Sequence, residues 1–307
     1  MVCLITGAAG MMGSHLYEAL RETDDVIPTY YKSTLDFREK ITEDMEVLDV
    51  LNKDNVKRVL SFYKPKVIYH LAAQSRPDVS FTDPALTINT NVIGTINLLE
   101  ACVDLALKPL FINASSSAVY GETMNEFDRR NDDWLIPPTE ADRCLPLSPY
   151  GTSKLAQEHI VKNFHEMHPI NYVNVRIFNC TGPRKVNDFV SDMCRRVVSD
   201  EDPIRVGNLK GVRSIVDVRD LVQGLIKCRN ISNQTINLGS GVSYNIEDVF
   251  RLIIGDRRYE VDSSLFRPTD EPLIVGNINK AKKILNWIPE ISLEQTITDT
   301  LDYWRTL

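Results

Sequence analysis

The sequence predicts an α/β protein whose main part is a doubly wound parallel sheet. Short apolar runs alternate with helical patterns over roughly the first 180 residues, which is typical of parallel strands joined by crossover helices. A glycine-rich turn joins the first apolar run to the first helical pattern. Beyond residue 180 the alternation loosens, so we expect a smaller α/β part at the C-terminus.

The composition excludes several classes of function. The chain has 307 residues, 43% of them hydrophobic, and a formal net charge of −7. This length can bury a large core, and the acidic balance argues against nucleic acid or an anionic membrane as partner. No apolar stretch approaches membrane-spanning length and the first residues do not resemble a signal peptide, so we expect a cytoplasmic protein. The six cysteines form no C-x-x-C pair, so no metal site is expected.

The turn after the first predicted strand, residues 2–6, has a glycine pattern. It reads Gly7-x-x-Gly10-x-x-Gly13, one residue longer in its first gap than the standard dinucleotide fingerprint. Gly7 permits the tight turn, Gly10 lets the backbone approach a pyrophosphate, and Gly13 lets the helix pack on the strand. The N-terminus of the new helix would face the phosphates. Glycines needed only for packing remain an alternative explanation.

Later strand ends add candidate contacts for a dinucleotide. Residues 26–31 and 45–50 predict two further strands, and Asp49 at the end of the second is placed to hydrogen-bond an adenine. A helix over residues 53–63 precedes a fourth strand, residues 66–70, which runs into Ala72 and Ala73. These small side chains would let a flat ligand lie on the backbone. A long helix over residues 84–105 follows.

The end of the second predicted strand bears on the choice between NAD(H) and NADP(H). A dinucleotide domain usually places an acid there, which binds the 2′-hydroxyl of the adenosine ribose. This chain has no acid before Asp36, whereas Lys32 and Ser33 would suit a 2′-phosphate. The sequence therefore favours NADP(H) over NAD(H), although a lysine that is only a solvated loop charge explains the pattern equally well.

The catalytic candidates follow the next predicted strand, residues 109–113. Serines stand at 115–117, and after a long loop a helix begins with Tyr150 and Lys154. The tyrosine and the lysine are four positions apart, so they lie on one face of the helix. The ammonium group is expected to lower the pKa of the tyrosine, which would let it exchange a proton near neutral pH. Each feature alone is common by chance, and their order along the chain gives them weight.

The C-terminal part is expected to begin after a strand predicted for residues 172–179. We expect residues 1–179 to bind the dinucleotide and residues 180–307 to bind mainly the substrate. A helix over 188–198 and short strands near 204–206 and 235–238 are predicted for this part. Arg213, Arg219 and Arg267 place positive charge there, so we expect the ligand between the two parts.

These motifs occur in an order that resembles the extended short-chain dehydrogenase/reductase family. The shared motifs are Gly7-x-x-Gly10-x-x-Gly13, His70-Leu71-Ala72-Ala73, Asn91-Val92-x-Gly94-Thr95, Ser116 and Tyr150-x-x-x-Lys154. The resemblance covers nearly the whole chain and implies a Rossmann fold, with Tyr150 as general acid/base, Lys154 as its partner and Ser116 as the catalytic serine. It also implies a set of cofactor-binding residues: Gly7, Gly10, Met11, Met12, Gly13, Lys32, Asp49, Val50, Leu71, Ala72, Ala73, Asn91, Tyr150 and Lys154.

Within that family, the C-terminal half is most similar to the GDP-mannose 4,6-dehydratases and GDP-4-keto-6-deoxymannose reductases. The similarity implies a GDP-linked nucleotide-diphosphate sugar as substrate. Its implied contacts are Ser117, Asn179, Arg184, Val190, Arg213 and Arg267. Arginines suit a diphosphate because the guanidinium fork binds its oxygens in pairs. The resemblance also implies a homodimer or tetramer built through the helices near 84–105 and 150–165, with a monomer as the alternative.

One departure from the family pattern bears on the reaction. Dehydratases of the family carry an acid, usually a glutamate, two residues after the catalytic serine or threonine, where it removes the C5 proton of the sugar. Ala118 stands there in this chain, and a methyl group cannot abstract a proton. We therefore expect an NAD(P)-dependent oxidoreductase acting at the sugar C4, either a GDP-4-keto-6-deoxyhexose reductase or a 4-epimerase. The alternatives are a GDP-mannose 4,6-dehydratase with its base elsewhere, at Glu122 or Glu140, and a non-catalytic NADP-binding scaffold.

Overall fold

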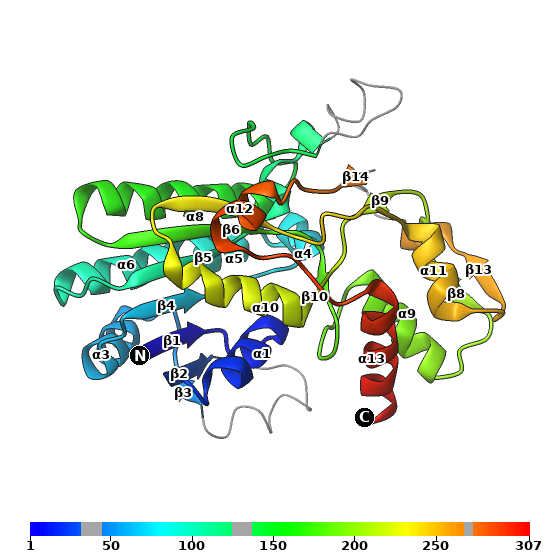
Figure 1. Cartoon of the computed structure of the whole chain (residues 1–307), viewed down its shortest axis with the longest axis horizontal. Coiled ribbons are helices and arrows are strands. Elements are labelled where there is room, and N and C mark those ends of the chain that lie inside the picture. Colours follow the sequence, from blue (N-terminus) through cyan, green and yellow to red (C-terminus); the bar gives the residue numbers. More distant parts are fainter. Residues whose placement is uncertain (32–44, 125–136, 267–272) are drawn as a thin grey trace.

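The computed structural model describes residues 1–31, 45–124, 137–266 and 273–307. Two predicted site residues, Lys32 and Arg267, lie outside these ranges. Within the described residues, seven parallel strands form the central sheet in the order β11-β6-β5-β4-β1-β2-β3 (Figure 1). These strands are β1 (Val2–Thr6), β2 (Asp25–Tyr30), β3 (Glu46–Val47), β4 (Val67–His70), β5 (Leu110–Ser116), β6 (Asn171–Ile177) and β11 (Gln234–Leu238).

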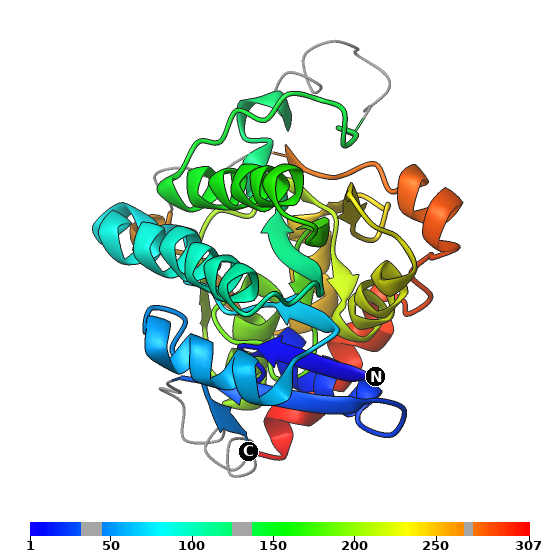
Figure 2. The same cartoon turned by 90° about the vertical axis from the view of Figure 1, so that its left-hand side faces the viewer.

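Helices cover both faces of this sheet, as Figure 2 shows. One face packs against α3 (Lys53–Tyr63), α6 (Gly94–Asp104) and α8 (Pro149–Met167), and the other against α1 (Met11–Leu20) and α10 (Val218–Lys227). Successive strand residues point to opposite faces, so Leu4 and Ile68 pack with the first set of helices and Ile5 and Tyr69 with the second. A parallel sheet needs this cover on both sides, and the predicted fold class is confirmed.

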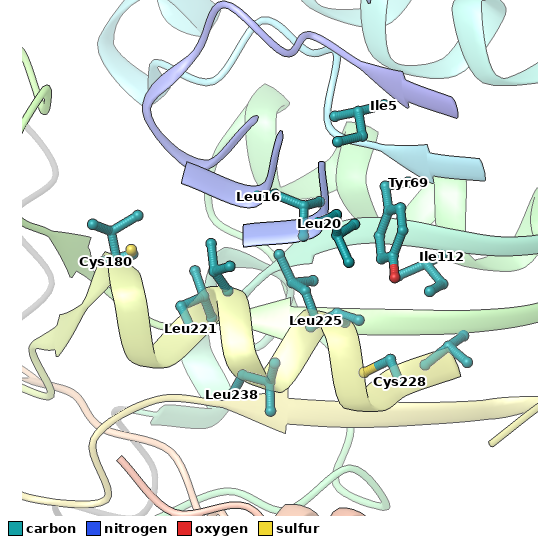
Figure 3. Close-up of a cluster of buried hydrophobic side chains, with 14 of the residues drawn as sticks. Ile5, Leu16, Leu20, Tyr69, Ile112, Cys180, Leu221, Leu225, Cys228 and Leu238 are labelled. Atoms are coloured by element: carbon teal, nitrogen blue, oxygen red, sulfur yellow. The ribbon is translucent and has the colours of Figure 1, made fainter. Parts of the chain in front are cut away.

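Figure 3 shows the core that holds α1 and α10 on the sheet. Leu16 and Leu20 of α1 and Leu221 and Leu225 of α10 are almost completely buried there, with Ile5 of the first strand. Burying each leucine stabilises the fold by about 1.5–3 kcal/mol. The packing fixes α1, so the position of its N-terminus is set relative to the end of β1.

Strand β11 corrects one expectation from the sequence. The pattern assigned residues 235–238 to the C-terminal part, whereas β11 pairs in parallel with β6 and lies at an edge of the central sheet. This pairing joins segments far apart in the sequence, and no local pattern encodes it. The central sheet therefore uses residues on both sides of position 179. The division into 1–179 and 180–307 remains a prediction about ligand contacts.

The helix expected over residues 84–105 is present but interrupted. It consists of α5 (Pro84–Ile88), a π-helical turn (Asn89–Ile93) and α6, and a short helix α4 (Pro77–Thr82) precedes it. The π-helical turn directs Asn91 into the core, where its Nδ2 donates to Gln74 O at 3.0 Å and to Ser153 Oγ at 2.9 Å. Turns of this kind often occur at functional sites. This one ties the loop after β4 to α8.

A smaller core lies beside one end of the sheet (Figure 1). It is built from α9 (Phe189–Val198), α11 (Ile246–Ile254), α13 (Leu293–Arg305), β8 (Ile204–Val206) and β13 (Tyr259–Val261). Shorter elements complete the fold: β7 (Cys180–Thr181), β9 (Val212–Arg213), β10 (Val216–Asp217), β12 (Tyr244–Asn245), β14 (Leu273–Ile274) and α12 (Asn279–Leu285). No helix among the described residues has the length and apolarity needed to cross a membrane. The same residues contain no cluster of three or more His, Cys, Asp or Glu suited to a metal ion.

Candidate active site

The predicted site residues gather where the parallel strands end. Gly7 follows β1, Asp49 follows β3, Leu71 follows β4, Ser116 ends β5 and Asn179 lies just beyond β6. Because the strands are parallel, their carboxyl ends meet at one edge of the sheet, which is where α/β folds bind ligands. Chain order and sheet order together thus bring distant motifs to a single edge.

The glycine-rich turn is shaped for close approach by the backbone. Gly7 has φ +72°, and a Cβ there would lie 2.9 Å from the backbone nitrogen of Ala72, so the loops after β1 and β4 touch. A Cβ on Gly13 would lie 2.4 Å from the carbonyl oxygen of Gly7. Met11 and Met12 then begin α1, whose N-cap residue Gly10 supplies no side-chain hydrogen bond.

The N-terminus of α1 therefore fits a dinucleotide pyrophosphate. The first N–H groups of a helix have no partner within the helix, and no cap side chain or first-turn acid competes for them here. The helix dipole adds a partial positive charge at the same end. Contact of the pyrophosphate with Gly7, Gly10, Met11, Met12 and Gly13 stays a prediction.

A buried hydrogen-bond chain holds the loop after β4. Thr6 Oγ1 accepts from the backbone N–H groups of Leu71 and Ala72, both at 3.1 Å. Its own proton is therefore directed to Nδ1 of His70, 2.9 Å away. Nε2 of His70 is left as the donor to Thr95 Oγ1 at 3.0 Å. A neutral histidine is thus built into the base of the loop that carries Leu71, Ala72 and Ala73.

This histidine predicts a pH dependence of stability. Burial and, second, the charge of Lys154 lower the pKa of His70 to about 3, whereas a histidine in the unfolded chain titrates near 6.5. Because the unfolded state binds the proton more readily between these values, the stabilising contribution is complete above pH 6.5 and is lost as the pH falls toward 3. Relative to His70→Gln, the wild type should lose about 2 kcal/mol of unfolding free energy between pH 6.5 and 5.

Urea unfolding of both proteins across that range measures the effect. His159→Gln, at an exposed histidine on α8, is the matched control and should run parallel to the wild type. Parallel curves for wild type and His70→Gln would instead show that His70 does not resist protonation.

The predicted adenine contacts lie in the turn between β3 and α3. Oδ1 of Asp49 accepts from the backbone N–H of Leu51 at 2.9 Å, and the carbonyl of Val50 accepts from Asn97 Nδ2 at 2.9 Å. Val50 also packs against Gly94, where a Cβ would lie 2.7 Å from Cγ2 of the valine. These contacts shape the turn. The contact of Asp49 with adenine remains a prediction, as do the cofactor contacts of Val50 and of Asn91, whose side chain is bound internally.

Strand β5 and helix α8 bring Ser116, Tyr150 and Lys154 together. Helix α8 begins at Pro149 and is capped by the hydroxyl of Ser148, which places Tyr150 in its first turn and Lys154 one turn later. Ser116 is hydrogen-bonded to the phenol of Tyr150. Nζ of Lys154 lies 5.9 Å from the centroid of the Tyr150 ring. Both side chains on α8 are buried.

The expected lowering of the tyrosine pKa is not what the structure shows. Burial raises the pKa of Tyr150, and the hydrogen bond with Ser116 acts in the opposite direction. Burial also lowers the pKa of Lys154 to about 7, so this lysine carries only part of its charge at neutral pH. The cost of removing both groups from water outweighs the attraction between them.

Position 118 lies between Ser116 and the start of α8. Ser117 and Ala118 form a 3₁₀ turn after β5, in which the backbone N–H of Ala118 donates to Ser116 Oγ at 3.2 Å. The carbonyl of Ala118 packs against Gly151, where a Cβ would come within 2.5 Å of it. A side chain at 118 therefore starts next to Ser116 and the beginning of α8, and here that side chain is a methyl group.

In the described part of the chain, neither Glu122 nor Glu140, the two alternative bases, has a hydrogen bond to the turn formed by residues 117–119. The carboxylate of Glu140 accepts a hydrogen bond from the backbone N–H of Asn237 at 2.7 Å, which ties it to β11. Glu122 is exposed. Among the described residues, no carboxylate contributes to the pKa shift of Tyr150, whose two causes are burial and Ser116.

A cavity of about 350 Å³ lies on the C-terminal side of the site. Asn179, Val190 and Arg213 line it together with Asp188 and Arg205. The amide of Asn179 donates to the carbonyl of Ser214 at 3.1 Å, which fixes its side chain beside the cavity. Three of the predicted substrate contacts are thus brought to one cavity, which mixes basic, acidic and apolar side chains.

Arg184 is placed elsewhere. It has φ +69° and does not line the cavity; its Nη2 donates to Glu18 of α1 at 2.7 Å. His15, on the same helix, contacts the neighbouring carbonyl of Pro183 through Nε2 at 3.1 Å. The Arg184 side chain therefore links α1 to the loop after β7, and this geometry does not support its predicted contact with the sugar diphosphate.

Comparison with known proteins assigns the family. A family model described as GDP-mannose 4,6 dehydratase matches residues 4–300. The chain belongs to this family. A GDP-mannose 4,6-dehydratase of Vibrio cholerae is 27% identical to it, over 97% of this chain and 92% of the relative. A putative UDP-glucose 4-epimerase of Methanocaldococcus jannaschii is also 27% identical, over 98% of both chains.

Solved structures of related enzymes have the same fold. The UDP-glucose 4-epimerase of Thermotoga maritima, solved with UDP-glucose, superposes with a TM-score of 0.89 at 28% identity, over 100% of this chain and 99% of that one. The Thermus thermophilus UDP-glucose 4-epimerase in complex with NAD gives 0.87 at 27% identity, over 99% of both chains. The predicted membership of the extended short-chain dehydrogenase/reductases is confirmed. The protein is an enzyme of the nucleotide-sugar epimerase and dehydratase class.

Sequence reasoning missed several groups around this family's catalytic motif. Glu158, one turn after Lys154 on α8, forms a buried ion pair with Arg176 of β6. A glutamate one turn after Lys154 on the buried face of the helix was an available signal, because buried carboxylates need a partner. Asp188 lines the cavity and caps α9, and its position at the start of the predicted helix was the corresponding signal.

Proposed function

We propose that the protein binds a nicotinamide dinucleotide and epimerises a nucleotide-diphosphate sugar at C4. When bound, the nicotinamide would take a hydride from C4 and return it to the opposite face of the resulting ketone. The hydroxyl of Tyr150 moves the matching proton at the C4 oxygen. Ser116 hydrogen-bonds the same oxygen and keeps the phenol oriented. Lys154 lies one turn from Tyr150 and supplies positive charge beneath it.

The observation that carries this proposal is the methyl group at position 118. Dehydration requires loss of the C5 proton, and the position where dehydratases place a carboxylate holds Ala118. Glu140 is engaged by β11 and Glu122 is exposed. The site therefore has groups for oxidation and reduction at C4 but no carboxylate beside Ser116 and Tyr150 in the described residues. The similarity to UDP-sugar 4-epimerases supports the same reaction.

A glutamate placed at 118 tests this reasoning. Ala118→Glu should introduce a base next to the sugar, so the variant incubated in D₂O with substrate and cofactor should exchange the C5 proton for deuterium. The wild type should show no exchange at C5. Ala118→Gln has nearly the same volume without the charge and is the matched control. Proton NMR of the sugar measures the exchange, and exchange by the wild type would contradict the proposal.

The diphosphate is proposed to bind at Asn179, Val190 and Arg213, with Arg267 as a further contact. The first three of these residues line the cavity, which supports the proposal because the guanidinium of Arg213 suits phosphate oxygens. We propose a GDP-linked sugar as the first substrate to test, following the family match, and UDP-linked sugars as the second. Steady-state rates with each compound distinguish the two.

The cofactor preference is a separate proposal. Lys32 favours NADP(H), whereas the Thermus epimerase was solved with NAD. Fluorescence titration of the purified protein with NADH and NADPH compares the two affinities directly. Tighter binding of NADH would reverse the prediction drawn from Lys32.

A keto-sugar reductase is the second candidate. The GDP-deoxysugar motifs of the C-terminal half favour it. Stoichiometric loss of NADPH with GDP-4-keto-6-deoxymannose would identify a reductase. An epimerase consumes no cofactor over a full cycle, so the absorbance of the reduced nicotinamide separates the two reactions.

We also propose a homodimer built through α4 to α6. Exposed apolar side chains gather on this segment: Phe81, Leu86, Ile88 and Ile93. Such a patch is typical of an interface. Sedimentation equilibrium should give a dimer for the wild type and a monomer for Leu86→Glu/Ile93→Glu. A monomeric wild type would contradict the proposal.

A further inference from the structure

A buried ion pair lies one helical turn beyond Lys154 on α8. Glu158 of α8 and Arg176 of β6 are only 6% and 7% exposed, and Arg176 Nη2 donates to Glu158 Oε2 at 2.8 Å. The guanidinium Nε donates to the same carboxylate, with 3.0 Å to Oε1. Removing two charges from water costs several kcal/mol per ion, so a pair in this position calls for an explanation beyond stability.

The carboxylate of Glu158 also holds the end of β5. Ser115 Oγ donates to Glu158 Oε1. Ser115 stands between Ala114, whose carbonyl accepts from Lys154 Nζ at 2.9 Å, and Ser116, which is hydrogen-bonded to Tyr150. A single carboxylate therefore fixes the strand segment that contacts both catalytic side chains of α8.

Arg176 keeps this carboxylate in place from the other side. Its Nη1 donates to the hydroxyl of Tyr120 at 3.0 Å, and that hydroxyl donates to Asn237 Oδ1 at 2.7 Å. The chain of contacts anchors Glu158 to β6 and β11. Burial lowers the pKa of Arg176, but the hydrogen bonds with Glu158 and the charge of its carboxylate outweigh burial and hold this pKa above its usual range.

Few charged or titratable groups surround Lys154. On α8 these are Tyr150 and Glu158; from β4, His70 faces it and stays neutral above about pH 3; on β6, Arg176 lies beyond Glu158. Among the described residues, the charge of Glu158 is the one that opposes the effect of burial on the lysine. It lies one helical turn from Lys154, on the same buried side of α8.

We propose that Glu158 is a positioning residue that favours the protonated form of Lys154 and fixes the end of β5 beside Tyr150. Only the catalytic use of the Lys154 charge rests on the proposed function. Lys154 in its protonated form lies beneath the phenol that exchanges a proton with the sugar. Without Glu158, the buried lysine would lose its proton at lower pH, and Ser115 would lose its acceptor.

The test follows the titration of Lys154 without turnover. Between the folded pKa of Lys154, about 7, and its unfolded value near 10.4, the unfolded state binds the proton more readily, so stability rises with pH. The difference in urea unfolding free energy between wild type and Lys154→Met should therefore be flat below pH 7 and rise above it. With Glu158→Gln in both proteins, we expect the onset of this rise at lower pH. An onset that stays near pH 7 would overturn the proposal.

Control variants separate charge from packing. Glu166→Gln removes an exposed carboxylate from the same helix and should leave the onset at pH 7. Ser115→Ala removes the hydrogen bond and keeps the charge, so it should also leave the onset in place. If Glu158→Gln does not fold, Glu158→Gln/Arg176→Met removes both charges and should still move the onset to lower pH.

Chemical rescue offers an independent readout. Glu158 and Arg176 line a cavity of about 420 Å³ that also contains Arg143 and Lys162. Formate should enter Glu158→Ala and return the onset to about pH 7, whereas neutral formamide of similar size should not. Equal effects of the two compounds would show that Glu158 acts through volume alone and would contradict the proposal.

Turnover assays on the same proteins distinguish the two proposals. Suppose that Glu158→Gln shifts the titration of Lys154 but the wild type turns over no nucleotide sugar. This result would contradict the proposed function and leave the role of Glu158 standing. An active wild type whose Lys154 titration is unaffected by Glu158→Gln would contradict the inference and leave the proposed function standing.

Discussion

Tyr150→Phe is expected to lower kcat by about 10²–10⁴-fold, with the fold retained and the affinity for the cofactor changed far less than kcat. The phenyl ring fills the same buried space at the start of α8, and only the hydroxyl bonded to Ser116 is removed. Turnover with a nucleotide sugar and fluorescence titration with NADH measure the two quantities separately.

Tyr69→Phe is the matched control for this experiment. The hydroxyl of Tyr69 is buried in the core of Figure 3 and has no hydrogen-bond partner among the described residues. Its removal should therefore leave kcat unchanged and cost no stability. Full activity of Tyr150→Phe would contradict the assignment of Tyr150 as acid/base. A wild type that binds cofactor but turns over no nucleotide sugar would favour the scaffold alternative.

The second large effect is expected from Arg176→Met. Methionine fills much of the volume but leaves Glu158 as an unpaired buried carboxylate, and breaking a buried pair in this way costs about 3–5 kcal/mol. The hydroxyl of Tyr120 also loses a donor. Urea unfolding at pH 7 should therefore show a strongly reduced free energy of unfolding.

Two further variants check the cause of this loss. Glu158→Gln/Arg176→Met removes both charges, so its loss should be clearly smaller than that of Arg176→Met alone. Arg305→Met disrupts an exposed pair with Asp302 and should have little effect. Equal losses in the single and the double variant would show that the Arg176 effect comes from packing rather than from charge.

The parts of the fold predicted from sequence are those set by local pattern. The helix over residues 53–63 and the short strand at 204–206 were predicted with their observed bounds, because apolar periodicity and capping residues mark them. The position of β11 in the sheet could not be predicted in this way. It depends on pairing with β6, and nothing within the segment itself specifies that partner.

In the candidate site, too, the features set by local sequence could be predicted and those set by tertiary contacts could not. Tyr150 and Lys154 meet because a spacing of four residues on a helix brings them together, and the glycine turn is recognisable because backbone contact excludes a Cβ. The direction of the Tyr150 pKa shift depends on burial, which the motif does not report. The pairing of Arg184 with Glu18 depends on how α1 meets the loop after β7. That contact exists only in three dimensions.

Incubation of the enzyme with its cofactor and candidate sugars in D₂O tests the central claim most directly. GDP-mannose, UDP-glucose and UDP-glucuronate would be supplied separately, and the products followed by NMR and mass. We expect a C4 epimer of unchanged mass, with no deuterium at C5 and no net consumption of cofactor. Loss of one water from GDP-mannose, with deuterium entering the sugar, would contradict it and would show that a base outside the Ser116 turn removes the C5 proton.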